Sequence, residues 1–190
     1  MKRADVIEIV ATSTQCDDVI VATTGLISRE LFERFDSERN VYIPGSMGLV
    51  SSVGLGIALC DTNHRVVIID GDASLLMNLG SMVTIGSRRP KNLLHIVLDN
   101  GAYASCSEES SMSGTANFGL LAKDVGYKYT ATVGDREALK RAILSFKGGP
   151  GFLSAITELG GRRDFRRPQK LKEIKRRFMR FMSRQPKGKI

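Results

Sequence analysis

Four short runs of Val, Ile and Leu are continuously apolar and do not alternate with polar residues. Such runs are typical of β-strands covered on both faces, as in parallel sheets whose connections are helices. A strand exposed on one face would alternate apolar and polar residues instead. The sequence therefore predicts an α/β fold with buried strands. The four runs occupy residues 19–23, 66–70, 93–99 and 151–157.

Segments of helix length lie between these strands. Asp135 precedes Ala138 and Leu139, an arrangement that predicts a helix capped at its start by a carboxylate. Strands that alternate with helices form right-handed crossovers, so we expect a three-layer, doubly wound and mostly parallel sheet. Ligands of such sheets bind beyond the carboxyl ends of the strands. The predicted helices cover residues 47–60, 75–86, 118–125 and 135–146.

The first of these helices contains three glycines, Gly48, Gly54 and Gly56. Glycine inside a helix costs about 1 kcal/mol relative to Ala. The glycines therefore predict that another group approaches the helix backbone closely, either the neighbouring strand or a bound ligand. In the second helix, Met77 and Met82 share a face with Leu and Ile residues and are expected in the core.

The positive charge of the chain is concentrated at its C-terminal end. The formal net charge is +8, but residues 161–190 contain thirteen Lys and Arg against two acids, so residues 1–160 carry −3. We therefore predict a domain over residues 1–160 and a basic tail over residues 161–190. Apolar tail residues at helical spacing predict a helix that docks on the domain or on a partner. They are Leu171, Ile174, Phe178 and either Phe181 or Met182.

No stretch of the chain reaches the roughly 18 apolar residues of a membrane span, and its first residues lack the apolar block of a signal peptide. We expect a soluble, cytoplasmic protein with reduced cysteines. Cys16 and Cys60 are expected to be buried, and Cys106 to be a loop residue without a catalytic role. The two histidines lack metal-ligand spacing, so His95 is predicted in the core and His64 in a turn.

The run at 66–70 leads into the sequence Gly71-Asp72-Ala73-Ser74 at the start of a predicted helix. Free backbone N–H groups at a helix start can receive a phosphate, and the Ser74 hydroxyl adds a donor. The Asp72 carboxylate would repel that phosphate unless a divalent cation lay between them. An oxygen ligand beside a diphosphate is typical of Mg²⁺.

A second pair of oxygen-bearing side chains follows the next predicted strand. Asp99 and Asn100 lie at its end, and twenty-five residues separate Ala73 from Asp99. That length accommodates one helix, one strand and their turns, so the two strand ends should lie side by side in a parallel sheet. We therefore predict one site shared by Mg²⁺ and a phosphate-bearing ligand.

These residues resemble the thiamine diphosphate motif, in which the sequence GDG is followed by about twenty-five residues and a paired Asn. The resemblance continues through YIPGSMGLVSSVGLGIAL, DGDASLLMNLGSMVTIG and NLLHIVLDNGAY, and it covers nearly the whole chain. The sequence is most similar to the diphosphate-binding half of the sulfopyruvate and phosphonopyruvate decarboxylase family. The resemblance is strongest to its separate beta subunits.

The resemblance implies a role for each matching residue. Asp72 and Asn100 would bind Mg²⁺ through side-chain oxygens, and Ala102 through its carbonyl oxygen. Met47 would hold the cofactor bent, and the carbonyl of Gly45 would accept a hydrogen bond from the aminopyrimidine. The cofactor-binding residues implied in this way are Thr24, Gly25, Gly45, Ser46, Met47, Gly71, Asp72, Ala73, Ser74, Asn100, Ala102 and Tyr103.

The same resemblance implies an activity and a partner. The activity is decarboxylation of a short anionic 2-oxoacid, sulfopyruvate or phosphonopyruvate, with thiamine diphosphate and Mg²⁺ as cofactors. Enzymes of this type also need a glutamate beside the pyrimidine, and a chain of 190 residues has room for the diphosphate-binding half only. The glutamate is therefore expected on an alpha subunit with the pyrimidine-binding domain, in a hetero-oligomer or around a homodimer core.

Two other functions stay open at this point. The chain could belong to another thiamine enzyme, a 2-oxoacid oxidoreductase or a carboligase, although it has no cysteines in iron–sulfur cluster spacing. It could also be a non-catalytic binding module that uses its basic tail on an acidic partner or on nucleic acid. No RNA-binding motif favours nucleic acid.

Two segments depart from the family pattern. Ala73 replaces the last glycine of GDG, which requires a negative φ at residue 73. Glu108 and Glu109 follow the paired Asn, and two adjacent acids are unfavourable beside an anionic substrate.

Overall fold

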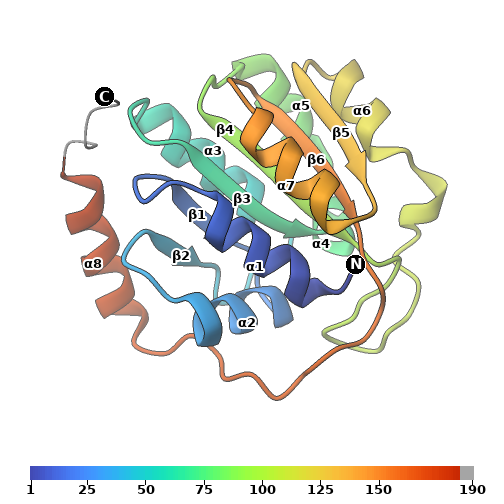
Figure 1. Ribbon diagram of the computed structural model, residues 1–190, viewed down its shortest axis with the longest axis horizontal. Coiled ribbons are helices and arrows are strands. Elements are labelled where there is room, and N and C mark those ends of the chain that lie inside the picture. Colours follow the sequence, from blue (N-terminus) through green and yellow to red (C-terminus); the bar gives the residue numbers. More distant parts are fainter. Residues whose placement is uncertain (185–190) are drawn as a thin grey trace.

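The carboxyl ends of six parallel strands lie at one edge of a single sheet. The computed structural model describes residues 1–184, and each strand pair within them is parallel. The strand order is β2-β1-β3-β4-β6-β5, so the direction of winding reverses between β1 and β3 (Figure 1). The strands are β1 (Val19–Ala22), β2 (Asn40–Tyr42), β3 (Val66–Gly71), β4 (Leu93–Asp99), β5 (Tyr129–Val133) and β6 (Gly151–Ile156).

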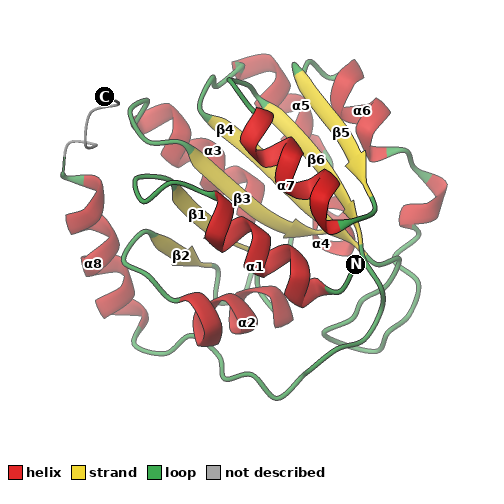
Figure 2. Cartoon of the chain, in the orientation of Figure 1, coloured by secondary structure: helices red, strands yellow, loops and turns green. Residues whose placement is uncertain are grey.

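Helices form most of the connections between the strands (Figure 2). A short 3₁₀ turn, η1, interrupts the long connection that follows β4. The helical elements are α1 (Arg3–Ser13), α2 (Leu26–Phe35), α3 (Val50–Cys60), α4 (Asp72–Met77), α5 (Gly80–Arg88), η1 (Ser113–Thr115), α6 (Phe118–Asp124), α7 (Arg136–Ser145) and α8 (Leu171–Met182).

Two hydrophobic cores lie on opposite faces of the sheet and give the three layers expected from the sequence. Helices α1, α2 and α7 pack on one face, where Leu31 and Ile69 are fully buried. Helices α3, α4, α5 and α6 pack on the other face, where Ile68 and Met82 are buried. Ile68 and Ile69 join different cores because successive side chains of a strand point to opposite faces. The predicted doubly wound, three-layer α/β fold is confirmed.

The four predicted strands are present as β1, β3, β4 and β6, and Asp135 caps α7 by accepting a hydrogen bond from the Ala138 backbone at 2.8 Å. The single helix predicted at 75–86 is wrong, because the chain leaves helical geometry at Asn78 and forms α4 and α5 instead. The break changes which side chains face inward. Met82 is buried as expected, but the prediction for Met77 is wrong, since 58% of its surface is exposed.

The cysteines differ from the sequence-based expectation. All three are exposed, so the prediction that Cys16 and Cys60 are buried is wrong. Cys16 lies in the turn between α1 and β1, and Cys60 ends α3 on its solvent side. The histidine predictions are confirmed: His95 is completely buried in β4, and His64 lies in the bend before β3.

The basic tail continues past β6 as an extended segment and ends in α8, which lies beside the edge strand β2 (Figure 1). Ile174, Phe178 and Phe181 bury their side chains against the domain, whereas Leu171 is exposed. The predicted docking helix is therefore confirmed, with Leu171 outside the buried stripe. Residues 185–190 of the predicted tail lie outside the described residues. Over residues 1–184, none of the helices is long and apolar enough to cross a membrane.

Candidate functional site

The carboxyl ends of β1, β3, β4 and β6 surround a pocket with a volume of about 70 Å³. Pockets that enclose a whole small ligand usually measure about 300–1,000 Å³. The difference indicates that this chain encloses only part of a ligand of that size. The pocket is lined by nine of the residues implicated from the sequence: Thr24, Met47, Gly71, Asp72, Ala73, Ser74, Asn100, Ala102 and Tyr103.

Three residues implicated from the sequence do not line this pocket. Gly25 directly follows the lining residue Thr24 and has a φ of +87°, a conformation that suits glycine. Gly45 and Ser46 precede the lining residue Met47 in the loop between β2 and α3, and Ser46 has a φ of +53°. These three residues are therefore near lining residues in the sequence but do not line the pocket themselves.

Two aspartates at the end of β3 point in different directions. Asp70 is fully buried in the sheet, where it accepts a hydrogen bond from the Gly71 backbone at 2.8 Å and lies 3.3 Å from Nε2 of His95. Asp72 begins α4 and lines the pocket with only 3% of its surface exposed. Asp70 therefore belongs to the interior of the fold, and Asp72 is the carboxylate available to a ligand.

The Asp72 carboxylate is held by Ser111, whose hydroxyl donates a hydrogen bond to Oδ2 of Asp72. Burial raises the pKa of the Asp72 carboxyl, the nearby charge of Asp99 raises it further, and the Ser111 hydrogen bond opposes both effects. An ionised carboxylate at this position is thus costly unless a cation neutralises it.

The turn after β4 places a second set of oxygens at the pocket. The Asn100 side-chain oxygen accepts a hydrogen bond from the Ala102 backbone at 3.0 Å, which fixes the side chain in the turn. The Ala102 carbonyl accepts a bond from the Ala104 backbone at 2.9 Å. Ser113 donates a hydrogen bond of 2.7 Å to Oδ1 of Asp99. Because amide and carbonyl oxygens have two lone pairs each, Asn100 and Ala102 can still bind a cation.

The Ser74 hydroxyl joins two segments of the pocket. Its Oγ lies 3.0 Å from Oγ1 of Thr23 and accepts a hydrogen bond from the Gly48 backbone at 3.1 Å. Ala73 lies in the first turn of α4, and it is absent from the residues with positive φ within the described chain. The methyl group of Ala73 therefore fits the backbone at this position, as the departure from GDG requires.

The donor set suits a divalent cation. Within residues 1–184, no salt bridge joins Asp72 or Asp99 to a cationic side chain. Over the same residues, no group of three or more His, Cys, Asp and Glu side chains is arranged to hold a metal. One carboxylate, one amide oxygen and one carbonyl oxygen match the hard oxygen ligands of Mg²⁺, which keeps several waters when bound.

Sequence reasoning missed several residues of the pocket region. Ser111 and Ser113 lie in a serine-rich loop whose spacing gives no sign that they reach Asp72 and Asp99. Thr23 ends the predicted first strand and precedes Thr24, which the resemblance implicated. This neighbour was the one sign in the sequence that Thr23 lies near the pocket and can contact Ser74. Arg3 lines the pocket from the first turn of α1, far from the motif in sequence.

The acidic loop after β4 is partly neutralised by the tail. Arg163 forms a hydrogen-bonded ion pair with Glu108, and both side chains are partly exposed. In Figure 1 the segment that follows β6 runs close to this loop before it turns toward α8. Glu108 has a φ of +61°, so this ion pair joins the tail to a tight turn of the loop. One of the two adjacent acids therefore has a cationic partner.

Comparison with known proteins assigns the family. Residues 29–154 match the family described as "Thiamine pyrophosphate enzyme, C-terminal TPP binding domain". The match covers more than half of the chain and contains both turns that meet at the pocket. The chain belongs to this family of thiamine pyrophosphate enzymes.

Curated relatives narrow the resemblance. The sulfopyruvate decarboxylase subunit beta of Methanocaldococcus jannaschii is 44% identical over 147 residues, which are 77% of this chain and 76% of that protein. The phosphonopyruvate decarboxylase of Streptomyces viridochromogenes is 35% identical over 175 residues, which are 90% of this chain and 44% of that protein. The chain thus spans less than half of the second relative. The resemblance to these decarboxylases is confirmed.

Solved structures share the fold. A 2-oxoglutarate:ferredoxin oxidoreductase from Magnetococcus marinus superposes with a TM-score of 0.70 at 14% identity, over 86% of this chain and 64% of that chain. Benzoylformate decarboxylase from Polynucleobacter necessarius superposes with a TM-score of 0.65 at 17% identity, over 88% of this chain and 34% of that chain. At these identities the likeness concerns the fold alone.

Proposed function

We propose that this chain is the cofactor-binding subunit of a decarboxylase that acts on a short anionic 2-oxoacid. The observation that carries the proposal is the meeting of two turns in one pocket. Gly71, Asp72, Ala73 and Ser74 arrive from β3, and Asn100 arrives from β4. The family match adds thiamine diphosphate as the cofactor that such a pair of turns would bind.

In this proposal Mg²⁺ is held by the side-chain oxygens of Asp72 and Asn100 and by the carbonyl oxygen of Ala102. The cation would neutralise the buried Asp72 carboxylate and the diphosphate together. Backbone groups of Gly71 and Ala73 would face the diphosphate. The Ser74 hydroxyl, already bonded to Thr23 and Gly48, would act mainly by fixing these segments.

Residues before and after the two turns complete the proposed site. Thr24 and Gly25 follow β1 and would contact the diphosphate, and Tyr103 would flank the metal turn. The Met47 side chain, which lines the pocket, would pack on the cofactor, while the Gly45 carbonyl and Ser46 would face its pyrimidine. Thiamine diphosphate supplies the electron sink for the electron pair released with CO₂. In this proposal the residues of this chain bind the cofactor, orient it and, through Mg²⁺, neutralise its diphosphate.

A partner subunit is part of the proposal because the pocket of this chain is incomplete. Its volume of about 70 Å³ is small, and none of the residues that line it within the described part of the chain is a glutamate. The pyrimidine-binding domain and its glutamate would come from an alpha subunit. The name of the Methanocaldococcus relative, a beta subunit, supports this arrangement. With such a partner the assembly would be a hetero-oligomer, which could contain a homodimer core.

The substrate class is taken from the same relatives, which are named for sulfopyruvate and phosphonopyruvate. Both substrates carry a second acidic group, so the charge around the pocket matters. The ion pair between Arg163 and Glu108 reduces the negative charge of the loop after β4. This ion pair would reduce the electrostatic repulsion between the acidic loop and an anionic substrate.

The first experiment is calorimetric titration of thiamine diphosphate with Mg²⁺ into the chain alone and into the complex with its partner subunit. We expect binding that is weak or absent for the chain and strong for the complex. Asp72→Ala should abolish Mg²⁺-dependent binding in the complex because it removes the proposed metal ligand. The exposed Glu109→Gln serves as the control that loses one charge outside the pocket.

Release of CO₂ from sulfopyruvate and from phosphonopyruvate then tests the activity. The proposal predicts turnover of at least one of them by the complex, and none by the Asp72→Ala complex. Tight cofactor binding without turnover of either acid would keep the cofactor assignment and reject the substrate class. No binding by chain or complex would reject the proposed function as a whole.

A further inference from the structure

A buried arginine lines the same pocket as the two turns at Asp72 and Asn100. Arg3 is in the first turn of α1, is 9% exposed, and lines the pocket together with Tyr103 and Thr157. No other Lys or Arg lines the pocket within residues 1–184. Arg3 is therefore the cationic group with which this part of the chain faces a ligand.

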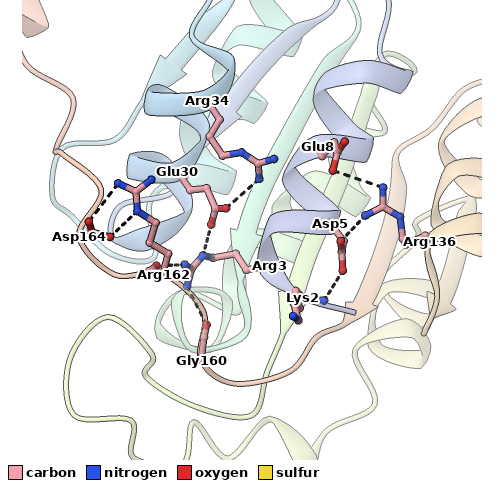
Figure 3. A network of polar contacts seen from close by, with 10 residues as sticks. All are labelled: Lys2, Arg3, Asp5, Glu8, Glu30, Arg34, Arg136, Gly160, Arg162 and Asp164. Atoms are coloured by element: carbon pink, nitrogen blue, oxygen red, sulfur yellow. Dashed lines mark hydrogen bonds and ion pairs between the residues drawn. The ribbon is translucent and has the colours of Figure 1, made fainter.

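Three contacts hold the Arg3 guanidinium in place (Figure 3). Its Nε donates a hydrogen bond of 2.7 Å to Oε2 of Glu30, and its terminal nitrogens donate to the backbone carbonyls of Gly160 and Arg162. A guanidinium has five N–H groups. Two of them have no acceptor among the residues that the structure describes, so Arg3 keeps donors for a ligand while its plane is fixed.

Glu30 does not cancel the charge of Arg3, because Glu30 serves two arginines. Its Oε1 accepts a hydrogen bond of 3.2 Å from Arg34, which lies one helical turn further along α2 (Figure 3). Two cations share one carboxylate, and the cluster of Arg3, Glu30 and Arg34 carries a net charge of +1. Arg3 and Glu30 are buried, with side chains that are 9% and 3% exposed, whereas the Arg34 side chain is 34% exposed.

The pocket lining thus carries charges of both signs. Within residues 1–184, Asp72 is its one acidic side chain and Arg3 its one basic side chain. A ligand with an acidic group could contact both a cation held by Asp72 and the Arg3 guanidinium. Planar N–H pairs of arginine suit phosphate, sulfonate and carboxylate oxygens.

We propose that Arg3 binds an anionic oxygen of the ligand in this pocket. The inference rests on the proposed function, which supplies two sources for that oxygen: the diphosphate of the cofactor, and the second acidic group of the substrate. Glu30 and the two carbonyls orient the guanidinium, while Arg34 contacts the other oxygen of Glu30, outside the pocket lining.

The test compares Arg3→Gln with Arg34→Gln in the complex of both subunits. Arg34 contacts the same carboxylate but does not line the pocket, so it is the matched control. If Arg3 binds the diphosphate, Arg3→Gln weakens the calorimetric affinity for thiamine diphosphate by about tenfold or more. If it binds the substrate's acid, the cofactor affinity is unchanged and KM for the substrate rises by a similar factor. Arg34→Gln should change either quantity less than about threefold.

A second measurement does not depend on the folding of a variant. The Nε–H signals of Arg3 and Arg34 in the ¹⁵N-labelled wild-type complex are followed by NMR during titration with Mg²⁺ and either inorganic pyrophosphate or phosphonoacetate. We expect the Arg3 signal to shift more than the Arg34 signal with one of these probes. Equal affinities and KM values in both variants, or an Arg3 signal that neither probe moves, would overturn the proposal. If the wild-type complex bound pyrophosphate but not thiamine diphosphate, the proposed function would fail while the role of Arg3 stood.

Discussion

Asp72 shows at the scale of one residue how a binding site can oppose stability. Burial raises the pKa of its carboxyl, so ionisation above that pKa costs the folded chain stability relative to the unfolded chain. We expect Asp72→Asn to raise the free energy of unfolding of the metal-free chain by about 1 kcal/mol. Urea unfolding measures the change. The wild type should gain further stability from millimolar Mg²⁺, and Asp72→Asn should not.

Ser111 could not be recognised from the sequence as a partner of Asp72, and its hydrogen bond opposes the rise that burial causes in the Asp72 pKa. Its hydrogen bond lowers the pKa of Asp72, so Ser111→Ala should raise that pKa further. Because Mg²⁺ binds the ionised carboxylate, the affinity for Mg²⁺ should fall severalfold, and as pH is lowered it should be lost at a higher pH than in the wild type.

Calorimetry with Mg²⁺ and thiamine diphosphate at several pH values provides the measurement for Ser111→Ala. Ser110→Ala is the control, because the Ser110 side chain is exposed and contacts Met112, not Asp72. Identical pH profiles for the two variants would show that Ser111 does not act through Asp72.

At the scale of elements, two glycines of α3 differ in the space around them. One is required by close packing, and the other is not. A Cβ on Gly54 would lie 2.4 Å from the side chain of Ile68, which is fully buried in β3. A Cβ on Gly56 would meet no atom within 4 Å. The close approach predicted from the sequence is thus the neighbouring strand at Gly54.

We expect Gly54→Ala to destabilise the chain by about 1–3 kcal/mol through overpacking, and Gly56→Ala to stabilise it by about 0.5–1 kcal/mol through helix propensity. Urea unfolding compares the two. Since β3 carries Ile68 and ends at Gly71, Gly54→Ala should also weaken cofactor binding by the complex. Equal stabilities for the two variants would contradict the packing argument.

At the scale of the whole molecule, the sequence predicts elements that have a regular apolar pattern. It does not predict features that depend on contacts between residues distant in the sequence. The strands with continuous apolar runs were predictable, whereas β2 has three residues and the run at 129–133 in β5 is half polar. The interruption between α4 and α5 at Asn78 could not be recognised in the sequence, because Leu75, Met82 and Ile85 keep helical spacing across it.

The same division holds for the candidate site. Asp72 and Asn100 could be placed together from topology alone, since each follows a strand and the two strands are neighbours. Ser111 contacts Asp72, and Arg3 lines the pocket, only because the fold brings the loop after β4 and the N-terminal helix to these positions. The spacing of residues along the chain does not indicate such contacts, so neither residue could be assigned to the site before the fold was known.

The last prediction concerns the tail as part of the whole fold. Helix α8 lies beside the edge strand β2, whose open hydrogen-bonding groups would otherwise be a site for aggregation. Phe178 is 7% exposed and belongs to the core on the α3 side of the sheet, while Met179 is 56% exposed. We expect Phe178→Ala to cost about 3 kcal/mol and Met179→Ala less than about 0.5 kcal/mol.

Thermal unfolding with light scattering measures both the stability and the aggregation of these two variants. If α8 protects the edge of the sheet, Phe178→Ala should aggregate at a lower temperature than Met179→Ala, since its helix detaches more readily. A Phe178→Ala chain as stable as the wild type would mean that the tail is an appendage whose basic face acts independently of the domain. The expected loss would instead make α8 a structural element that keeps the sheet, and with it the turns at Asp72 and Asn100, in a soluble form.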